Sequence, residues 1–107
     1  MPIRRPDEVD VEPVVLLSRW TVFRLEDGSV HLCGSAGFLE GRVSSAVKSF
    51  DYEDATAVTR SGRLYKLMGE PGPDEHAAYL WNEWTALYNV VGWEEVTDEV
   101  WSKVRTP

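Results

Sequence analysis

Two runs of alternating apolar and polar residues, joined by Asp27-Gly28, constrain the fold of this chain more than any other feature. A two-residue type I′ turn needs a positive φ at both central residues, and an Asp-Gly pair adopts this conformation readily. The sequence therefore predicts a β-hairpin from Trp20 to Cys33. The predicted pairs are Leu25 with Val30 and Phe23 with Leu32 on one face, and Arg24 with His31 and Val22 with Cys33 on the other. The first face is apolar and is predicted to face the core, whereas the second, which also carries Trp20, is mixed.

A second hairpin is predicted around Ser61-Gly62, because residues 55–60 and 63–68 also read as strands. Residues 42–50, with small side chains, predict a further strand before it. The same counting gives the pairs Val58 with Tyr65, Thr56 with Leu67, and Arg60 with Arg63. The last of these pairs places like charges opposite each other, which is unfavourable.

A long helix is predicted to begin at Pro73, with Asp74 and Glu75 in its first turn. Gly92 is a natural stop, so this helix is expected to run to about residue 91. Its apolar stripe comprises Ala77, Leu80, Trp81, Trp84, Leu87, Tyr88 and Val91. This stripe is expected to cover one face of the sheet.

Thr97 is predicted to cap a short second helix, and Val96 and Trp101 have the spacing of a hydrophobic staple across that cap. The predicted fold is α+β: an antiparallel sheet of four to five strands, built from two hairpins, packed by one long C-terminal helix, plus a short terminal helix. A chain of 107 residues is the size of one domain. Residues 1–13 are predicted to form a flexible tail, and residues 14–107 a single domain.

The composition excludes several classes of protein. No apolar run approaches the ~20 residues of a membrane-spanning helix, and the start of the chain lacks the apolar stretch of a secretory signal. A single cysteine excludes a disulfide framework and a multi-cysteine zinc site. With a formal net charge of −7, the chain is expected to be a soluble, acidic, cytoplasmic protein.

Catalytic, cofactor and metal sites find little support in the sequence. The glycine-rich segment at residues 34–41 lacks both the Lys-Ser/Thr ending of a P-loop and the G-x-G-x-x-G spacing, which favours a plain loop between strands. His31 and Cys33 share one face of a strand, but a structural zinc site needs four ligands. A half-buried histidine beside an apolar cysteine is the simpler interpretation. We therefore expect no catalytic residue, no cofactor and no metal.

Charge is distributed unevenly along the chain. Residues 1–41 carry a net charge of −3, residues 42–66 carry +2, and residues 70–107 carry −6. Direct nucleic-acid binding is disfavoured, because the overall negative charge repels phosphates. The acidic C-terminal third instead suits a partner protein with a basic surface, and no membrane partner is expected.

The first functional hypothesis is a non-enzymatic protein–protein interaction module. The side of the predicted helix opposite its apolar stripe carries Tyr79 and Glu83, and aromatic residues among acids are common at interfaces. Residues 93–104 are an alternative cover for this row, with Trp93 and Trp101 folded over it. The candidate partner contacts are Tyr79, Glu83, Glu94 and Glu95, with Arg60 and Arg63 as a second, basic patch.

Two other hypotheses compete with it. The chain could be a small-ligand or anion-binding, enzyme-like protein with a pocket between the sheet and the helix end. The residues expected to line that pocket are Arg42, Arg60, Arg63 and His31. Arginines that converge on one pocket would favour this alternative, and arginines that point into water would favour the interaction module. The third hypothesis is a homodimer paired through the sheet edge at residues 42–50.

Three segments within residues 41–84 carry a resemblance: GRVSS at 41–45, TRSGRLYKLMGEPG at 59–72 and YLWNEW at 79–84. They resemble a group of short uncharacterised bacterial proteins, many of them encoded on phages, prophages and plasmids. The resemblance implies the setting of a mobile element, where small acidic proteins often inhibit a host defence or nucleic-acid-handling complex, as anti-CRISPR proteins do. It implies no catalytic residue.

Overall fold

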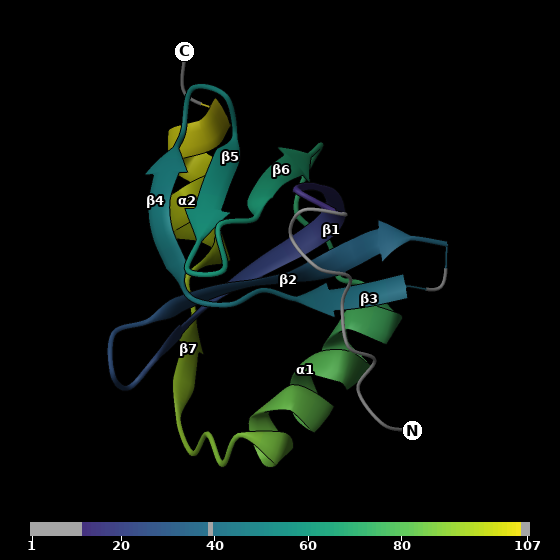
Figure 1. Ribbon diagram of the computed structural model, residues 1–107, viewed down its shortest axis with the longest axis vertical. Helices are drawn as coiled ribbons and strands as arrows, with labels where there is room; N and C mark the ends of the chain where they lie inside the picture. Colours follow the sequence, from purple (N-terminus) through teal and green to yellow (C-terminus); the bar gives the residue numbers. More distant parts are fainter. Residues whose placement is uncertain (1–11, 39, 106–107) are drawn as a thin grey trace.

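The long strand β1 (Val14–Leu25) organises the fold, because three other strands pair with it. The computed structural model describes residues 12–38 and 40–105. The remaining elements, in chain order, are β2 (Val30–Gly37), β3 (Glu40–Val43), β4 (Val47–Asp51), β5 (Thr56–Thr59), β6 (Leu64–Met68), α1 (Glu75–Leu87), β7 (Trp93–Glu95) and α2 (Thr97–Arg105) (Figure 1).

The sheet is mixed and folds round on itself. Its strand order is β3-β2-β1-β6-β5-β4, and β7 pairs with β1 outside this path. β1 runs parallel to β6 and antiparallel to both β2 and β7. The two ends of the path are consecutive in the chain, since β3 ends at Val43 and β4 begins at Val47. The sheet therefore wraps around a core instead of lying open beneath one helix.

The prediction of a four-to-five-stranded antiparallel sheet with one long C-terminal helix is wrong. In the described part of the chain the sheet has seven strands, and the two helices have 13 and 9 residues. Residues 42–50 contribute to two strands because the chain changes partners there. The Ser44 amide donates to Leu32 O in β2 at 2.8 Å, whereas Ala46 O accepts from the Arg60 amide, just beyond β5, at 2.8 Å.

Both predicted hairpins form, but the register of each is displaced by one residue. The Leu25 amide donates to Ser29 O at 2.9 Å, so the first turn has three residues and Gly28 takes a φ of 88°. Gly62 occupies the same position in the second turn, with a φ of 87°. The observed pairs are Phe23 with His31, Val22 with Leu32, Ala57 with Tyr65, and Val58 with Leu64. A three-residue turn with a left-handed glycine uses the same dipeptide as a type I′ turn, so the dipeptide does not distinguish them.

An irregularity in β1 decides which of its side chains reach the core. The pairing with β2 shifts between Ser18 and Thr21, and Arg19 has a positive φ of 47°. An extra residue of this kind changes the alternation of a strand. The buried residues of β1 are therefore Val15, Leu17, Trp20 and Val22. Trp20 and Val22, which the sequence places on the mixed face, therefore lie in the main core together with Leu32, whereas Phe23 and Cys33 pack beneath α1.

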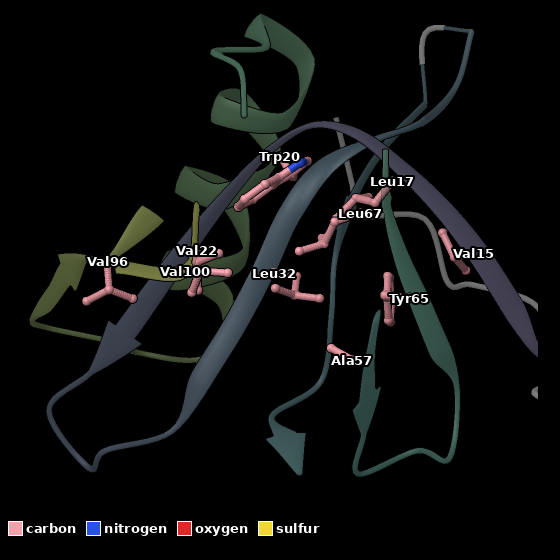
Figure 2. Packing of buried hydrophobic residues seen from close by; sticks show 10 residues of the cluster. All are labelled: Val15, Leu17, Trp20, Val22, Leu32, Ala57, Tyr65, Leu67, Val96 and Val100. Atoms are coloured by element: carbon pink, nitrogen blue, oxygen red, sulfur yellow. The ribbon is translucent and has the colours of Figure 1, made fainter. Parts of the chain in front are cut away.

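The main core lies inside the folded sheet (Figure 2). Its buried members are Val15, Leu17, Trp20, Val22, Leu32, Ala57, Tyr65, Leu67, Val96 and Val100. α2 closes one side of this core, and the Thr97 hydroxyl at its start accepts a hydrogen bond from the Val22 amide at 3.0 Å. Val96 and Trp101 both belong to this cluster.

A second, smaller core lies on the other face of β1 and β2, beneath α1. Cys33, Ala77 and Trp81 are buried there, and Phe23 and Trp84 pack against them. The two ring planes of Phe23 and Trp81 are stacked, with centroids 4.1 Å apart. Both faces of the first hairpin are thus covered, one by the folded sheet with α2 and the other by α1 (Figure 1).

α1 begins two residues after the predicted start at Pro73 and ends well before the predicted stop. Asp74 is its N-cap, and its carboxylate accepts a hydrogen bond from the Ala77 amide at 2.9 Å. After Leu87 the chain leaves the helix through Asn89, whose φ is 56°. Asparagine tolerates the left-handed conformation that ends many helices, so Gly92 is not needed as a stop. Along the described residues neither helix has the length and apolar character required to cross a membrane.

Candidate functional site

An apolar surface lies where α1 gives way to β7. The residues of this α1–β7 surface are Leu87 (61 % exposed), Tyr88 (61 %), Val91 (86 %) and Trp93 (41 %). Rings beneath the surface hold it in place: Trp84 lies 5.1 Å from Tyr88, measured between ring centroids. Trp81 lies 5.3 Å from Trp84 and 5.8 Å from Trp93. Side chains that are already packed lose little conformational entropy on binding, so this surface is well suited to contact a partner.

Sequence reasoning missed this surface because it extended α1 too far. Leu87, Tyr88 and Val91 were assigned to the core-facing stripe, but the helix ends at Leu87 and all three are exposed. Trp93, which no predicted element accommodated, packs edge-on against Trp81 at an interplanar angle of 84°. Asn89 was the available signal, because asparagine often provides the left-handed residue after a helix.

Tyr79 and Glu83 lie one turn apart on α1, and Tyr79 is exposed while Glu83 is half-buried. The Tyr79 side chain is hydrogen-bonded to Glu83, and this bond raises the pKa of Tyr79. The expected alternative cover by Trp93 and Trp101 is not observed, since Trp93 contacts Trp81 and Trp101 contacts Trp20. Tyr79 is 51 % exposed, so the predicted contact row stays accessible.

The two adjacent acids of β7 have different surroundings. Arg24 Nη1 lies 2.9 Å from Glu94 Oε1, and Arg24 Nη2 lies 3.1 Å from Glu99 Oε2. The hydrogen bonds that Arg24 donates to these two carboxylates raise the pKa of Arg24. Glu95 is exposed, and within residues 12–38 and 40–105 it has no ion-pair partner. Glu95 therefore presents more uncompensated negative charge to a partner than Glu94 does.

Arg60 and Arg63 do not form one exposed basic patch. Arg60 is exposed in the three-residue turn, whereas Arg63 is buried and its Nε donates to the Glu12 main-chain oxygen at 2.9 Å. The predicted like-charge pair also does not arise, because Thr59 rather than Arg60 lies opposite Arg63.

Arg42 is buried beside the same Glu12. Its Nη2 lies 3.1 Å from Glu12 Oε1 and 3.9 Å from Glu40 Oε1. Burial opposes the charge of Arg42, but hydrogen bonding and attraction to Tyr65 and Glu12 outweigh it and raise the pKa of Arg42. Glu12 is thus packed onto the domain, and residues 1–11 of the predicted tail lie outside the described residues.

His31 occupies a different place from the arginines. Its Nδ1 lies 2.9 Å from Ser44 O, which means that Nδ1 carries a proton, since a carbonyl oxygen only accepts. Its ring centroid lies 4.9 Å from that of Trp84. Of the four residues expected to line an arginine pocket, the structure brings Arg42 and Arg63 together at Glu12 but leaves Arg60 in a turn and His31 under α1.

Cys33, which follows His31 by two residues, is buried and points toward α1. Its Sγ donates to Ala77 O at 3.2 Å. Burial, with a smaller contribution from Asp74, raises the pKa of the Cys33 thiol to about 12. Among the described residues no three or more histidine, cysteine or acidic side chains are grouped so as to hold a metal ion.

The Cys33 thiol is expected to be unreactive in the folded protein. At pH 8, reaction with a chromogenic disulfide reagent should be at least about 100-fold slower than in the urea-unfolded chain, because only the thiolate reacts and the site must open first. The thiol of the unfolded chain ionises near its ordinary pKa, whereas that of the folded protein ionises only near 12. The free energy of unfolding should therefore fall as the pH rises between these two values. Equal reaction rates in the folded and unfolded protein would contradict this assignment, and Cys33→Ala isolates the thiol's share of the pH dependence.

Comparison of the chain with protein-family models, with curated proteins and with solved structures finds no significant match.

Proposed function

We propose that this chain is a non-enzymatic interaction module that binds another protein through the α1–β7 surface. The observation that carries the proposal is the exposure of four large apolar side chains, Leu87, Tyr88, Val91 and Trp93, at one end of α1. Leaving such side chains in contact with water is unfavourable. A contiguous apolar surface with a polar border is typical of protein contact sites.

The charges beside this surface favour a partner with a basic surface. Glu95 carries the least compensated charge of β7, and Glu83 lies on the exposed row of α1. Opposite charge on the partner would raise the rate of association and fix its orientation. The resemblance of residues 41–84 to proteins of mobile elements adds a candidate class of partner, a host defence or nucleic-acid-handling complex. An arginine-lined ligand pocket is less favoured, because Glu12 already engages Arg42 and Arg63.

The experiment is affinity purification of a partner from a bacterial host, followed by binding measurements with purified components. Combining Tyr88→Ser with Val91→Ser is expected to weaken binding by at least about tenfold, because tyrosine is enriched among the few interface residues that contribute most of the binding energy and the second change removes further apolar contact. Both side chains are largely exposed, so the variant should fold. Glu95→Lys is expected to slow association and to reduce its dependence on salt.

Phe38→Ser is the matched control, because Phe38 is 94 % exposed and lies in the connection between β2 and β3, away from the end of α1 (Figure 1). It removes a comparable exposed ring without touching the α1–β7 surface. A partner that binds the Tyr88/Val91 variant as tightly as the unmodified protein, or that loses affinity only with Phe38→Ser, would refute the proposed surface.

A further inference from the structure

A groove of about 330 Å³ lies between β4 and α2, and none of the residues expected to contact a partner protein or to line an arginine pocket lies in it, although residues 47–50 belong to the segment named as a dimer edge. Its volume falls within the range of small-molecule sites. The apolar lining residues are Val30, Val47, Val96 and Val100. Val96 and Val100 are buried members of the main core, so this part of the groove is fixed by the packing of the domain itself (Figure 2).

Aromatic rings form one wall of the groove. Phe50 and Tyr52 are stacked, with centroids 5.2 Å apart and an interplanar angle of 10°. Both rings also pack against the main core, which restrains their movement. Because these two rings face each other and Lys103 lies over Tyr52, a further flat ring would contact the outer face of Phe50 or the edges of the two rings, and both are favourable aromatic geometries.

The charged residues at the groove leave a local excess of positive charge. Arg24 is paired with Glu94 and Glu99, and these three groups together carry a net charge of −1. Lys103 Nζ lies 5.1 Å from the centroid of the Tyr52 ring, and Lys103 has no carboxylate partner among the described residues. Lys48 is exposed and likewise forms no ion pair there. With these two lysines the charged groups at the groove sum to +1, although the net charge of the chain is −7.

We propose that the groove between β4 and α2 binds a small anion that carries a flat aromatic ring. The ring would pack against Phe50, Tyr52 and the valines, while Lys48 and Lys103 would bind the anionic group. A nucleoside monophosphate and an aromatic carboxylate share this chemistry. An ammonium head group is excluded by the two lysines, and a ring without charge forgoes the attraction that they provide.

The test is a titration of the full chain with adenosine 5′-monophosphate or with indole-3-acetate. Two-dimensional NMR spectra recorded during the titration report the chemical shifts of the backbone amides. Adenosine and tryptamine are the matched controls, because they keep each ring but remove the negative charge or replace it with a positive one. At least one anion is expected to shift amides of residues 47–52 and 96–103, and to bind at least about tenfold more tightly than its control. Binding of only the phosphate or only the carboxylate probe would identify the source of the anion.

Charge reversal locates the site. Combining Lys48→Glu with Lys103→Glu is expected to weaken binding of the anion by at least about tenfold. Arg60→Glu makes the same charge change per residue on an exposed turn outside the groove, and it should leave the affinity within about twofold at moderate salt. The proposal is overturned if neither anion binds, if the uncharged or cationic control binds as well, if the shifted amides lie elsewhere, or if Arg60→Glu weakens binding as strongly.

Discussion

Replacing Trp20 with alanine is expected to lower the free energy of unfolding by about 3–5 kcal/mol, as for other large buried aromatic side chains. Trp20 is wholly buried in the main core, and its ring packs edge-on against Trp101 with centroids 6.1 Å apart. Its indole N–H donates to Gly69 O at 3.1 Å, so truncation removes a hydrogen bond as well as a large apolar contact. Urea unfolding followed by circular dichroism measures the change.

Because a domain of this size is stable by only about 5–15 kcal/mol, Trp20→Ala could unfold entirely, and Trp20→Phe provides a milder comparison. Phenylalanine keeps most of the apolar contact but leaves Gly69 O without its donor, so we expect a loss of about 1–3 kcal/mol. Trp93→Ala is the control on the α1–β7 surface. Trp93 is 41 % exposed, and its loss is expected to cost less than about 1.5 kcal/mol. Similar costs for Trp20→Ala and Trp93→Ala would contradict the assignment of Trp20 to the core.

The second large effect is expected at Glu12. Glu12→Gln removes the carboxylate beside buried Arg42 and should destabilise the protein by about 2–3 kcal/mol, because it leaves a buried charge less well compensated. This expected cost is smaller than for a buried arginine that loses its sole carboxylate partner, because Glu40 remains 3.9 Å from Arg42. Urea unfolding at neutral pH measures it.

A double-mutant cycle separates this ion pair from general packing. Arg42→Met keeps much of the buried volume and removes the charge, so Glu12→Gln should cost far less in an Arg42→Met background. An unchanged cost in that background would show that the Glu12 carboxylate acts through a group other than Arg42, because Glu12→Gln leaves in place the main-chain oxygen that accepts from Arg63.

The two hairpins show how far local sequence determines this fold. Asp27-Gly28 and Ser61-Gly62 correctly predict where the chain reverses, because only a residue without a Cβ adopts a positive φ at no steric cost. They do not determine the number of residues in the turn. One additional turn residue displaced both registers, so Arg63 became a buried neighbour of Glu12 instead of an exposed partner of Arg60.

The candidate surfaces were predicted less well than the elements that carry them. Tyr79 and Glu95 are exposed as expected and Glu83 is half-buried, but Leu87, Tyr88 and Val91, which the sequence assigns to the core, are exposed. Periodicity continued past Leu87, and only the left-handed Asn89 ended the helix. The groove between β4 and α2 was beyond sequence reasoning, because its residues come from β2, β4 and α2 and meet only through the folded sheet.

The sequence by itself determined the positions of the two hairpin turns and, to within two residues, the starts of the two helices, since these depend on neighbouring residues and on allowed backbone angles. Only the tertiary structure decided which strands pair and which faces are buried. The bend between Ser44 and Ala46 and the irregularity at Arg19 let one sheet close around a core while α1 covers its outer face. Both depend on hydrogen bonds between residues far apart in the chain. Local sequence patterns do not specify which distant residues form such bonds.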